Sequence, residues 1–162
     1  IDKLAYNHFT KEKDSPLKYW KMICHDTKYR VCYADTDRMG IMYYGNYPRL
    51  YEIGRTDFIR EIWKSYREVE DNGIILPVRM LHSVYHKPAI YDECLTIRTI
   101  IKEIPKVKLT FYSQIYNEKG ELINEGEVVL GFMNAKTGRI CRIPEEFNKI
   151  LEEKFALNDG FQ

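Results

Sequence analysis

The pattern of hydrophobic and polar positions first becomes regular at Lys28, where the segment KYRVCYAD alternates between the two kinds of residue. Tyr29, Val31 and Tyr33 fall on one side of an extended chain, and polar residues fall on the other. A period of two residues is typical of a half-buried strand. We therefore predict a strand that begins at Lys28 and ends at the aspartates of the run DTD.

The spacing changes after Pro48, where apolar residues recur every three or four positions with charged residues between them. This period is typical of a helix with one buried side, and the segment is long enough for about four turns. The residues expected on the buried side are Leu50, Ile53, Gly54, Phe58, Ile62 and Trp63.

The rest of the chain is rich in strand-forming residues, and turn residues separate its segments. The predicted strand segments are 78–89, 93–104, 106–117, 121–134 and 139–144, followed by a terminal helix over 145–157. The connections are too short for parallel crossovers, so consecutive strands are expected to pair antiparallel as a meander. The sequence thus predicts an α+β fold, in which one long helix lies across a sheet of about five or six strands.

The length of 162 residues corresponds to one domain. Residues 1–27 show no clean period and are interpreted as an accessory N-terminal extension, which leaves 28–162 as a single domain. Lys plus Arg number 25 and Asp plus Glu number 24, so the net charge of +1 gives no indication of a nucleic-acid partner. No apolar run approaches the roughly 20 residues of a membrane span, and a cytoplasmic protein is expected.

A metal site is not expected. His82 and His86 lie in a strand-like stretch, where they would be about 13 Å apart, too far for one zinc ion. The cysteines are widely spaced and form no CxxC pair, so reduced thiols are expected at Cys24, Cys32, Cys94 and Cys141.

The run DTDRMG, residues 35–40, has several interpretations. The aspartates could cap backbone amides in a turn for which Gly40 supplies a positive φ. A calcium loop of the EF-hand type opens similarly, but Met39 and Asn46 stand where that loop needs oxygen ligands. No GxSxG elbow or phosphate-binding loop is present in the sequence.

The position of Asp37 also suggests acyl-transfer chemistry. It follows a predicted strand and precedes a helix whose first turn is favoured by Asn46 and Pro48. The unpaired amides at a helix start carry partial positive charge and would polarise a carbonyl group docked there. A nearby carboxylate could attack that carbonyl or activate a water molecule.

The same stretch resembles the signature of hotdog-fold acyl-CoA thioesterases, in the branch that contains 4-hydroxybenzoyl-CoA thioesterase and the Tol-Pal-associated thioesterases. The likeness rests on YADTD (33–37), Gly40, YYGNY (43–47) and the following RLYEIGR, and it extends from about Lys28 to Pro144. It implies a long central helix wrapped by a curved antiparallel sheet. It also implies homodimers or homotetramers with active sites at the subunit interface.

The resemblance implies that Asp37 is the catalytic carboxylate and that the amides at Tyr44 and Gly45 bind the oxyanion. Asn46, Lys106 and Lys108 are the candidate substrate-binding residues, although the lysines could equally be solvated turn residues. The expected reaction is hydrolysis of an acyl-CoA without a cofactor, with Asp37 either as nucleophile or as general base. The alternative is a non-catalytic hotdog module that binds acyl chains or acyl carrier protein.

Overall fold

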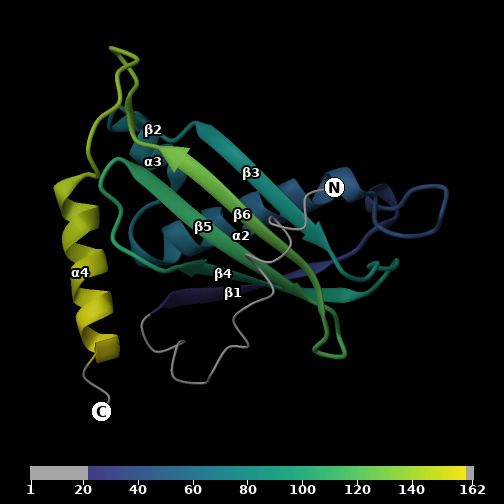
Figure 1. Ribbon diagram of the computed structural model, residues 1–162. Coiled ribbons are helices and arrows are strands. Elements are labelled where there is room, and N and C mark those ends of the chain that lie inside the picture. The colour runs from purple at the N-terminus through teal and green to yellow at the C-terminus, as the bar shows by residue number, and fades with distance from the viewer. Residues whose placement is uncertain (1–21, 160–162) are drawn as a thin grey trace, which may run out of the picture.

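The computed structural model describes residues 22–159, so the part of the predicted extension over 1–21 lies outside the described residues (Figure 1). Its central feature is a sheet of five antiparallel strands in the order β1-β4-β5-β6-β3. The strands are β1 (Ile23–Arg30), β3 (Val78–Tyr85), β4 (Cys94–Ile101), β5 (Lys108–Tyr116) and β6 (Leu122–Gly131).

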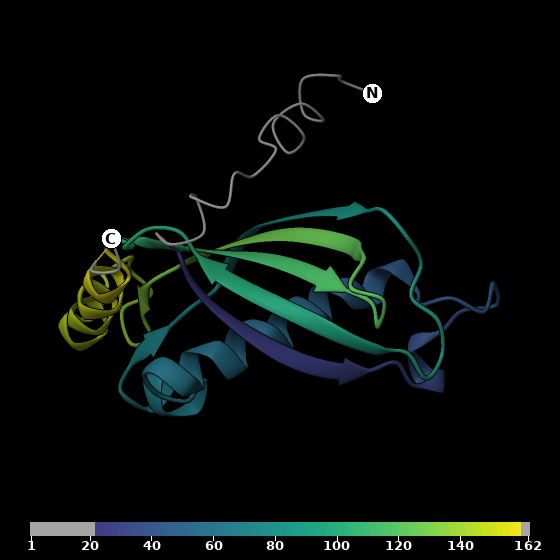
Figure 2. The same ribbon diagram turned by 90° about the horizontal axis from the view of Figure 1, so that it is seen from below.

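The sheet curves around the long helix α2 (Tyr47–Ile62), which lies across its concave face (Figure 2). Leu50, Phe58 and Ile59 of α2 are buried, as are the alternating strand residues Leu109 and Phe111 of β5. Burial on one side of the helix and on one side of β4, β5 and β6 forms a single core between the two layers. The predicted α+β architecture with one long helix is thus confirmed.

Close packing of α2 depends on two glycines. A Cβ atom on Gly54 would lie 2.5 Å from Thr99 Oγ1 of β4, and one on Gly126 of β6 would overlap the ring of Tyr51. The Tyr51 hydroxyl bonds Ser83 Oγ at 2.6 Å and also Asn124. These contacts attach the helix to the β3 side of the sheet.

The sheet differs from the predicted meander. β1 begins at Ile23, ahead of the predicted start at Lys28, and pairs along its whole length with β4. β3 pairs with β6 instead of with the next strand, β4. The segment 86–93 therefore carries the chain from one edge of the sheet toward the other, and hydrophobic patterning does not specify which edge a strand joins.

The elements around the second, smaller sheet were predicted less well. The predicted strand over 139–144 is reduced to one bridge between Ile140 and Met133. A small sheet instead joins β2 (Ile74–Ile75) to β7 (Met133–Asn134), beside the short helix α3 (Tyr66–Asp71).

The predicted C-terminal helix is confirmed as α4 (Glu145–Asp159), which packs beside the sheet through Phe147, stacked on Trp63 (Figures 1 and 2). No helix within residues 22–159 is long and apolar enough to cross a membrane.

Candidate active site

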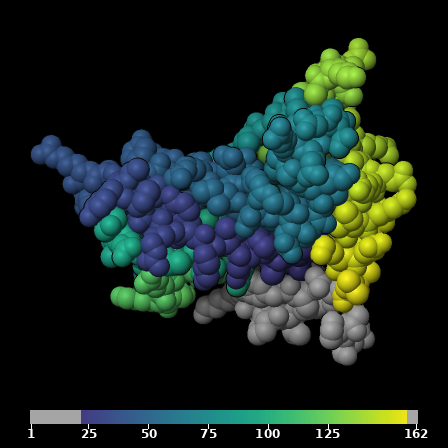
Figure 3. Space-filling model, turned by 180° about the vertical axis from the view of Figure 1, so that it is seen from behind, coloured from purple at the N-terminus to yellow at the C-terminus, as the bar shows by residue number. Residues whose placement is uncertain are grey.

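One loop carries most of the predicted site residues and connects β1 to α2. It contains two short 3-10 helices, η2 (Tyr33–Asp35) and η3 (Tyr44–Asn46), and η3 continues directly into α2. Between them a turn is closed by a bridge between Thr36 and Met42. This turn projects from one end of the molecule (Figures 2 and 3).

Asp35 is buried at the base of this loop, with 2% of its surface exposed. One carboxylate oxygen accepts hydrogen bonds from the Tyr29 hydroxyl at 2.7 Å and from the Cys32 amide at 2.9 Å. The other oxygen accepts one from Arg49 at 2.8 Å. Burial alone would raise the pKa of Asp35, but the bonds from Cys32 and Tyr29 and the charge of Arg49 outweigh it and lower the pKa below its ordinary value. Asp35 is therefore held as a carboxylate.

The backbone carbonyl of Asp35 also joins the two ends of the loop. It accepts hydrogen bonds from the Tyr43 amide at 2.8 Å and from Asn46 Nδ2 at 2.9 Å. The Asn46 side chain thus uses its nitrogen within the loop. Its predicted role in substrate binding remains a prediction, for which its oxygen and the second hydrogen of its nitrogen are left.

Asp37 has a different environment, half-exposed at the start of the turn. Its Oδ1 accepts a hydrogen bond from the Met39 amide at 2.8 Å, and its own amide donates to the Ile41 carbonyl at 2.9 Å. Gly40 completes the turn with a φ of 76°. The other carboxylate oxygen of Asp37 makes no hydrogen bond within the described residues. Asp37 can therefore cap the turn with one oxygen and still have the catalytic role that the sequence predicts.

The short helix η3, which precedes α2, has two unpaired backbone amides among the described residues. The amides of Tyr43 and Asn46 donate within the loop, whereas those of Tyr44 and Gly45 have no acceptor among the described residues. The Tyr43 ring packs against the Tyr44 ring, with 4.7 Å between their centres, and the hydroxyl of Tyr44 and, more weakly, the charge of Asp37 raise the pKa of Tyr43. Asp37, Tyr44 and Gly45 thus belong to one loop, which the bond from the Tyr43 amide to the Asp35 carbonyl closes.

Gly45 lies directly against the Tyr43 side chain. A Cβ atom there would be 2.5 Å from Tyr43 Cε1, so any larger residue would displace the ring. The adjoining Tyr44 carbonyl accepts a hydrogen bond from the Tyr85 hydroxyl at 3.1 Å. Contacts on both sides therefore fix the peptide plane that joins these two residues.

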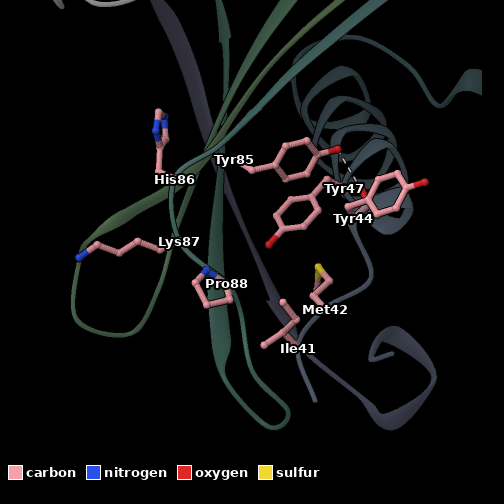
Figure 4. A pocket seen from close by; sticks show the side chains of 8 residues that line it. All are labelled: Ile41, Met42, Tyr44, Tyr47, Tyr85, His86, Lys87 and Pro88. Carbon is pink, nitrogen blue, oxygen red and sulfur yellow. Dashed lines mark hydrogen bonds between the residues drawn. The ribbon is translucent and has the colours of Figure 1, made fainter. Parts of the chain in front are cut away.

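A hollow of about 320 Å³ opens beside this peptide (Figure 4). The rings of Tyr44, Tyr47 and Tyr85 lie together on one side, and Lys87 and His86 lie on the other. Its lining is mostly apolar and consists of Ile41, Met42, Tyr44, Tyr47, Tyr85, His86, Lys87 and Pro88. Asp37 is not among these residues, although Ile41, its hydrogen-bond partner, is.

The sequence analysis did not identify most of the residues that line this hollow. Tyr47 belongs to the helix start and is buried, which raises the pKa of its hydroxyl. Tyr85 and Pro88 come from β3 and the segment after it, which reaches the loop through the bond from the Met42 amide to the Ala89 carbonyl at 2.8 Å. Of these three residues, Tyr47 belongs to a sequence signal, the run YYGNY of the family resemblance.

The two basic residues of the hollow are paired with acids of β6 and its preceding turn. His86 Nε2 lies 2.8 Å from Glu125, and Lys87 Nζ lies 2.5 Å from Glu121. The hollow therefore contains no unpaired cation among the described residues.

Lys106 and Lys108 do not line this hollow. Lys108 begins β5 and pairs with Gly131 at the end of β6, whereas the loop lies where β5 ends and β6 begins. The length of β5 alone, about 27 Å at about 3.4 Å per residue, separates the lysines from the hollow of the same chain. Their role as phosphate ligands remains a prediction.

Comparisons with known proteins agree with this architecture. The family model of the thioesterase-like superfamily matches residues 31–151. YneP of Bacillus subtilis, which is named as a candidate acyl-CoA thioesterase, is 34% identical over 120 residues. These residues cover 74% of this chain and 80% of that protein. The acyl-CoA thioester hydrolase YbgC of Escherichia coli is 34% identical over 101 residues, which cover 62% of this chain and 75% of that protein.

Among solved structures, the DHNA-CoA thioesterase of Staphylococcus aureus superposes with a TM-score of 0.76 and 30% identity, covering 87% of this chain and 95% of that one. The predicted hotdog fold is therefore confirmed. The names of these relatives also bear out the predicted enzyme class, that of thioester hydrolases. The chain belongs to the thioesterase-like superfamily.

Proposed function

We propose that this protein hydrolyses an acyl-CoA thioester to a free acid and coenzyme A. The proposal rests above all on one observation: Asp37, with a free carboxylate oxygen, lies on a fixed turn of the same loop that carries the unpaired amides of Tyr44 and Gly45. Those amides lie in η3, which continues into the long helix α2, and the dipole of α2 adds to their partial positive charge. An apolar hollow beside them offers space for an acyl group.

In the proposed reaction the thioester carbonyl oxygen accepts hydrogen bonds from the Tyr44 and Gly45 amides. These bonds strengthen as the carbonyl carbon becomes tetrahedral and its oxygen gains negative charge. Asp37 either attacks the carbon, giving a mixed anhydride that water then hydrolyses, or removes a proton from an attacking water molecule. In both routes the carbon–sulfur bond breaks, coenzyme A leaves as a thiolate that takes up a proton, and Asp37 is regenerated.

We further propose that the functional unit is a homodimer or a larger homo-oligomer. β3 forms an edge of the sheet and exposes Val78, Met80, Leu81 and Tyr85, an apolar row that a second copy would cover. Lys106 and Lys108, which are remote from the hollow of their own chain, would reach the coenzyme A of a partner subunit.

The test is hydrolysis of a panel of acyl-CoA substrates, short-chain, long-chain and aromatic, followed with a free-thiol reagent. We expect thiol release from at least one class by the wild-type protein and none above background by the Asp37→Asn variant. Binding of the panel without thiol release would instead support the alternative, a non-catalytic module for acyl chains. Light scattering at micromolar concentration tests the oligomer, and an active monomer would contradict that part of the proposal.

A further inference from the structure

We propose that Asp35 and Arg49 form a positioning pair that holds the Asp37 turn at a fixed distance from the helix start. This inference rests on the proposed function, because it concerns how Asp37 is kept in place for that reaction. Neither residue is assigned to contact the substrate. Their role is exerted through the backbone that connects them to Asp37, Tyr44 and Gly45.

The first observation is the way in which Asp35 is bound. A buried carboxylate costs several kcal/mol unless donors compensate for its lost hydration. Tyr29, the Cys32 amide, the Cys32 thiol and Arg49 all donate to it, the thiol at 3.1 Å. These donors come from β1, from the loop and from α2, so the carboxylate is a junction of three parts of the chain.

The second observation is that Arg49 provides the link to the helix. It lies in the first turn of α2 and donates from one nitrogen to Asp35 at 2.8 Å and to the Tyr29 hydroxyl at 3.0 Å. Its guanidinium carbon lies 5.4 Å from the centre of the Tyr29 ring. Arg49 is also 53% exposed, so the core does not require it for packing. An exposed arginine held by three contacts to one site indicates a specific rather than a general stabilising role.

The third observation is the backbone of Asp35, which continues into Thr36 and Asp37. The Asp35 carbonyl binds the Tyr43 amide and Asn46 Nδ2, on either side of the two free amides. Displacement of Asp35 would therefore move Asp37 and the oxyanion amides relative to each other. A misplacement of about 1 Å between reacting groups can lower a rate by about 100-fold.

Arg49 is the better residue to substitute, since Asp35→Asn places an amide among donors inside the protein and could fail to fold. Arg49→Gln leaves three donors on Asp35 and changes an exposed side chain. We expect it to lower kcat about 10-fold with KM changed less than about 2-fold, because substrate contacts are kept and only the alignment of the reacting groups suffers. Arg49→Lys, which keeps one charged nitrogen within reach, should recover kcat to within about 3-fold of wild type.

A matched control comes from the Arg98–Asp26 pair between β4 and β1, which is also joined at 2.8 Å but lies outside the loop. Arg98→Gln should leave kcat unchanged, with a shift of the melting temperature similar to that of Arg49→Gln. The double variant Asp35→Asn/Arg49→Gln, if folded, should lose no more kcat than the worse single variant, since both break one link.

The results separate the two proposals. If wild type releases no thiol from any acyl-CoA, the proposed function fails. If wild type is active and Arg49→Gln keeps full kcat, the positioning pair is wrong. If kcat falls equally in Arg49→Gln and Arg98→Gln, the loss reflects general stability, which also overturns the pair. If Arg49→Lys recovers no activity although its melting temperature is normal, the loss reflects the shape of the side chain, and the pair is again wrong.

Discussion

The two halves of the loop between β1 and α2 place the same residue type in opposite environments. Around Asp35 the loop is packed, and donors occupy both carboxylate oxygens. Around Asp37 the loop is a half-exposed turn, and a single backbone amide binds the carboxylate. A carboxylate whose two oxygens are both bound by donors is a poor nucleophile or base, so the buried half can fix geometry while the exposed half remains available for chemistry.

This difference also explains why the more exposed aspartate is the better catalytic candidate. Burial often marks functional carboxylates by raising their pKa, but hydrogen bonds and the Arg49 charge more than offset burial at Asp35 and lower its pKa. Such a group holds its proton too weakly to serve as a base near neutral pH. The comparison therefore predicts effects of different size and kind for the two halves.

The largest effect is expected for Asp37→Asn. Loss of the carboxylate should lower kcat at least about 100-fold, while acyl-CoA still binds, because the amides and the hollow are unchanged. The Met39 amide can still donate to the remaining amide oxygen, so the melting temperature should change little. Steady-state kinetics and substrate binding by the inactive variant measure this. A larger kcat loss for a folded Asp35→Asn than for Asp37→Asn would reverse the roles assigned to the two halves.

Lys106 and Lys108 provide a contrast to both halves, because a phosphate contact remote from the carbonyl should act on binding alone. Replacing both with Ala should raise KM for an acyl-CoA about 5-fold to 10-fold, with kcat nearly unchanged, since exposed charge contacts contribute only about 0.2 to 1 kcal/mol each. A small thioester without the nucleotide should be hydrolysed equally by both proteins. Equal losses on the two substrates would show that the lysines support the fold or the subunit interface instead.

A smaller effect is expected for Gly45→Ala, which tests the boundary between the turn and the helix. The added methyl group would overlap Tyr43 Cε1, and the flexible ring can move away at little cost in stability. Because that ring lies near Asp37, we expect kcat to fall about 3-fold to 5-fold while the melting temperature stays within about 2 °C. Gly120→Ala, in the turn between β5 and β6, is unsuitable as a control because its φ of 75° strains any other residue. Gly131→Ala, whose Cβ would have only an ordinary contact at 3.8 Å, is the matched control.

The sequence predicts much of the path of the chain through this site. The alternation after Lys28 and the helical spacing after Pro48 place a strand end and a helix start on either side of the DTD run, and the structure confirms both elements. These signals are local, so they depend little on the rest of the fold. The S-x-x-E pattern at Ser65 and Glu68 was a further local signal, and it caps α3, which was not predicted.

What the sequence could not predict depends on contacts between distant segments. Periodicity does not show which aspartate of DTD is buried, because the burial of Asp35 depends on the approach of Tyr29 and Arg49. The hollow likewise brings Tyr85 of β3 next to Tyr44, which requires β3 to pair with β6. Strand order of this kind is set by the global packing and not by the periodicity of any one strand.

The smallest expected effect is on stability at acid pH, and it tests the buried half of the loop through Asp35 alone. The folded pKa of Asp35 lies below its ordinary value of 3.8, so the unfolded chain binds this proton more readily than the native protein does. The free energy of unfolding gained from Asp35 is therefore fully present above the ordinary pKa and is lost as the pH falls through the folded pKa. Urea unfolding between pH 7 and pH 2 should show a smaller decrease in the free energy of unfolding for Asp35→Asn than for wild type. Arg49→Gln should reduce that decrease in part, because it removes one of the groups that lower the pKa of Asp35. An acid loss as steep in both variants as in wild type would show that Asp35 is not held as a carboxylate by these contacts, and that the two halves of the loop differ less than their geometry indicates.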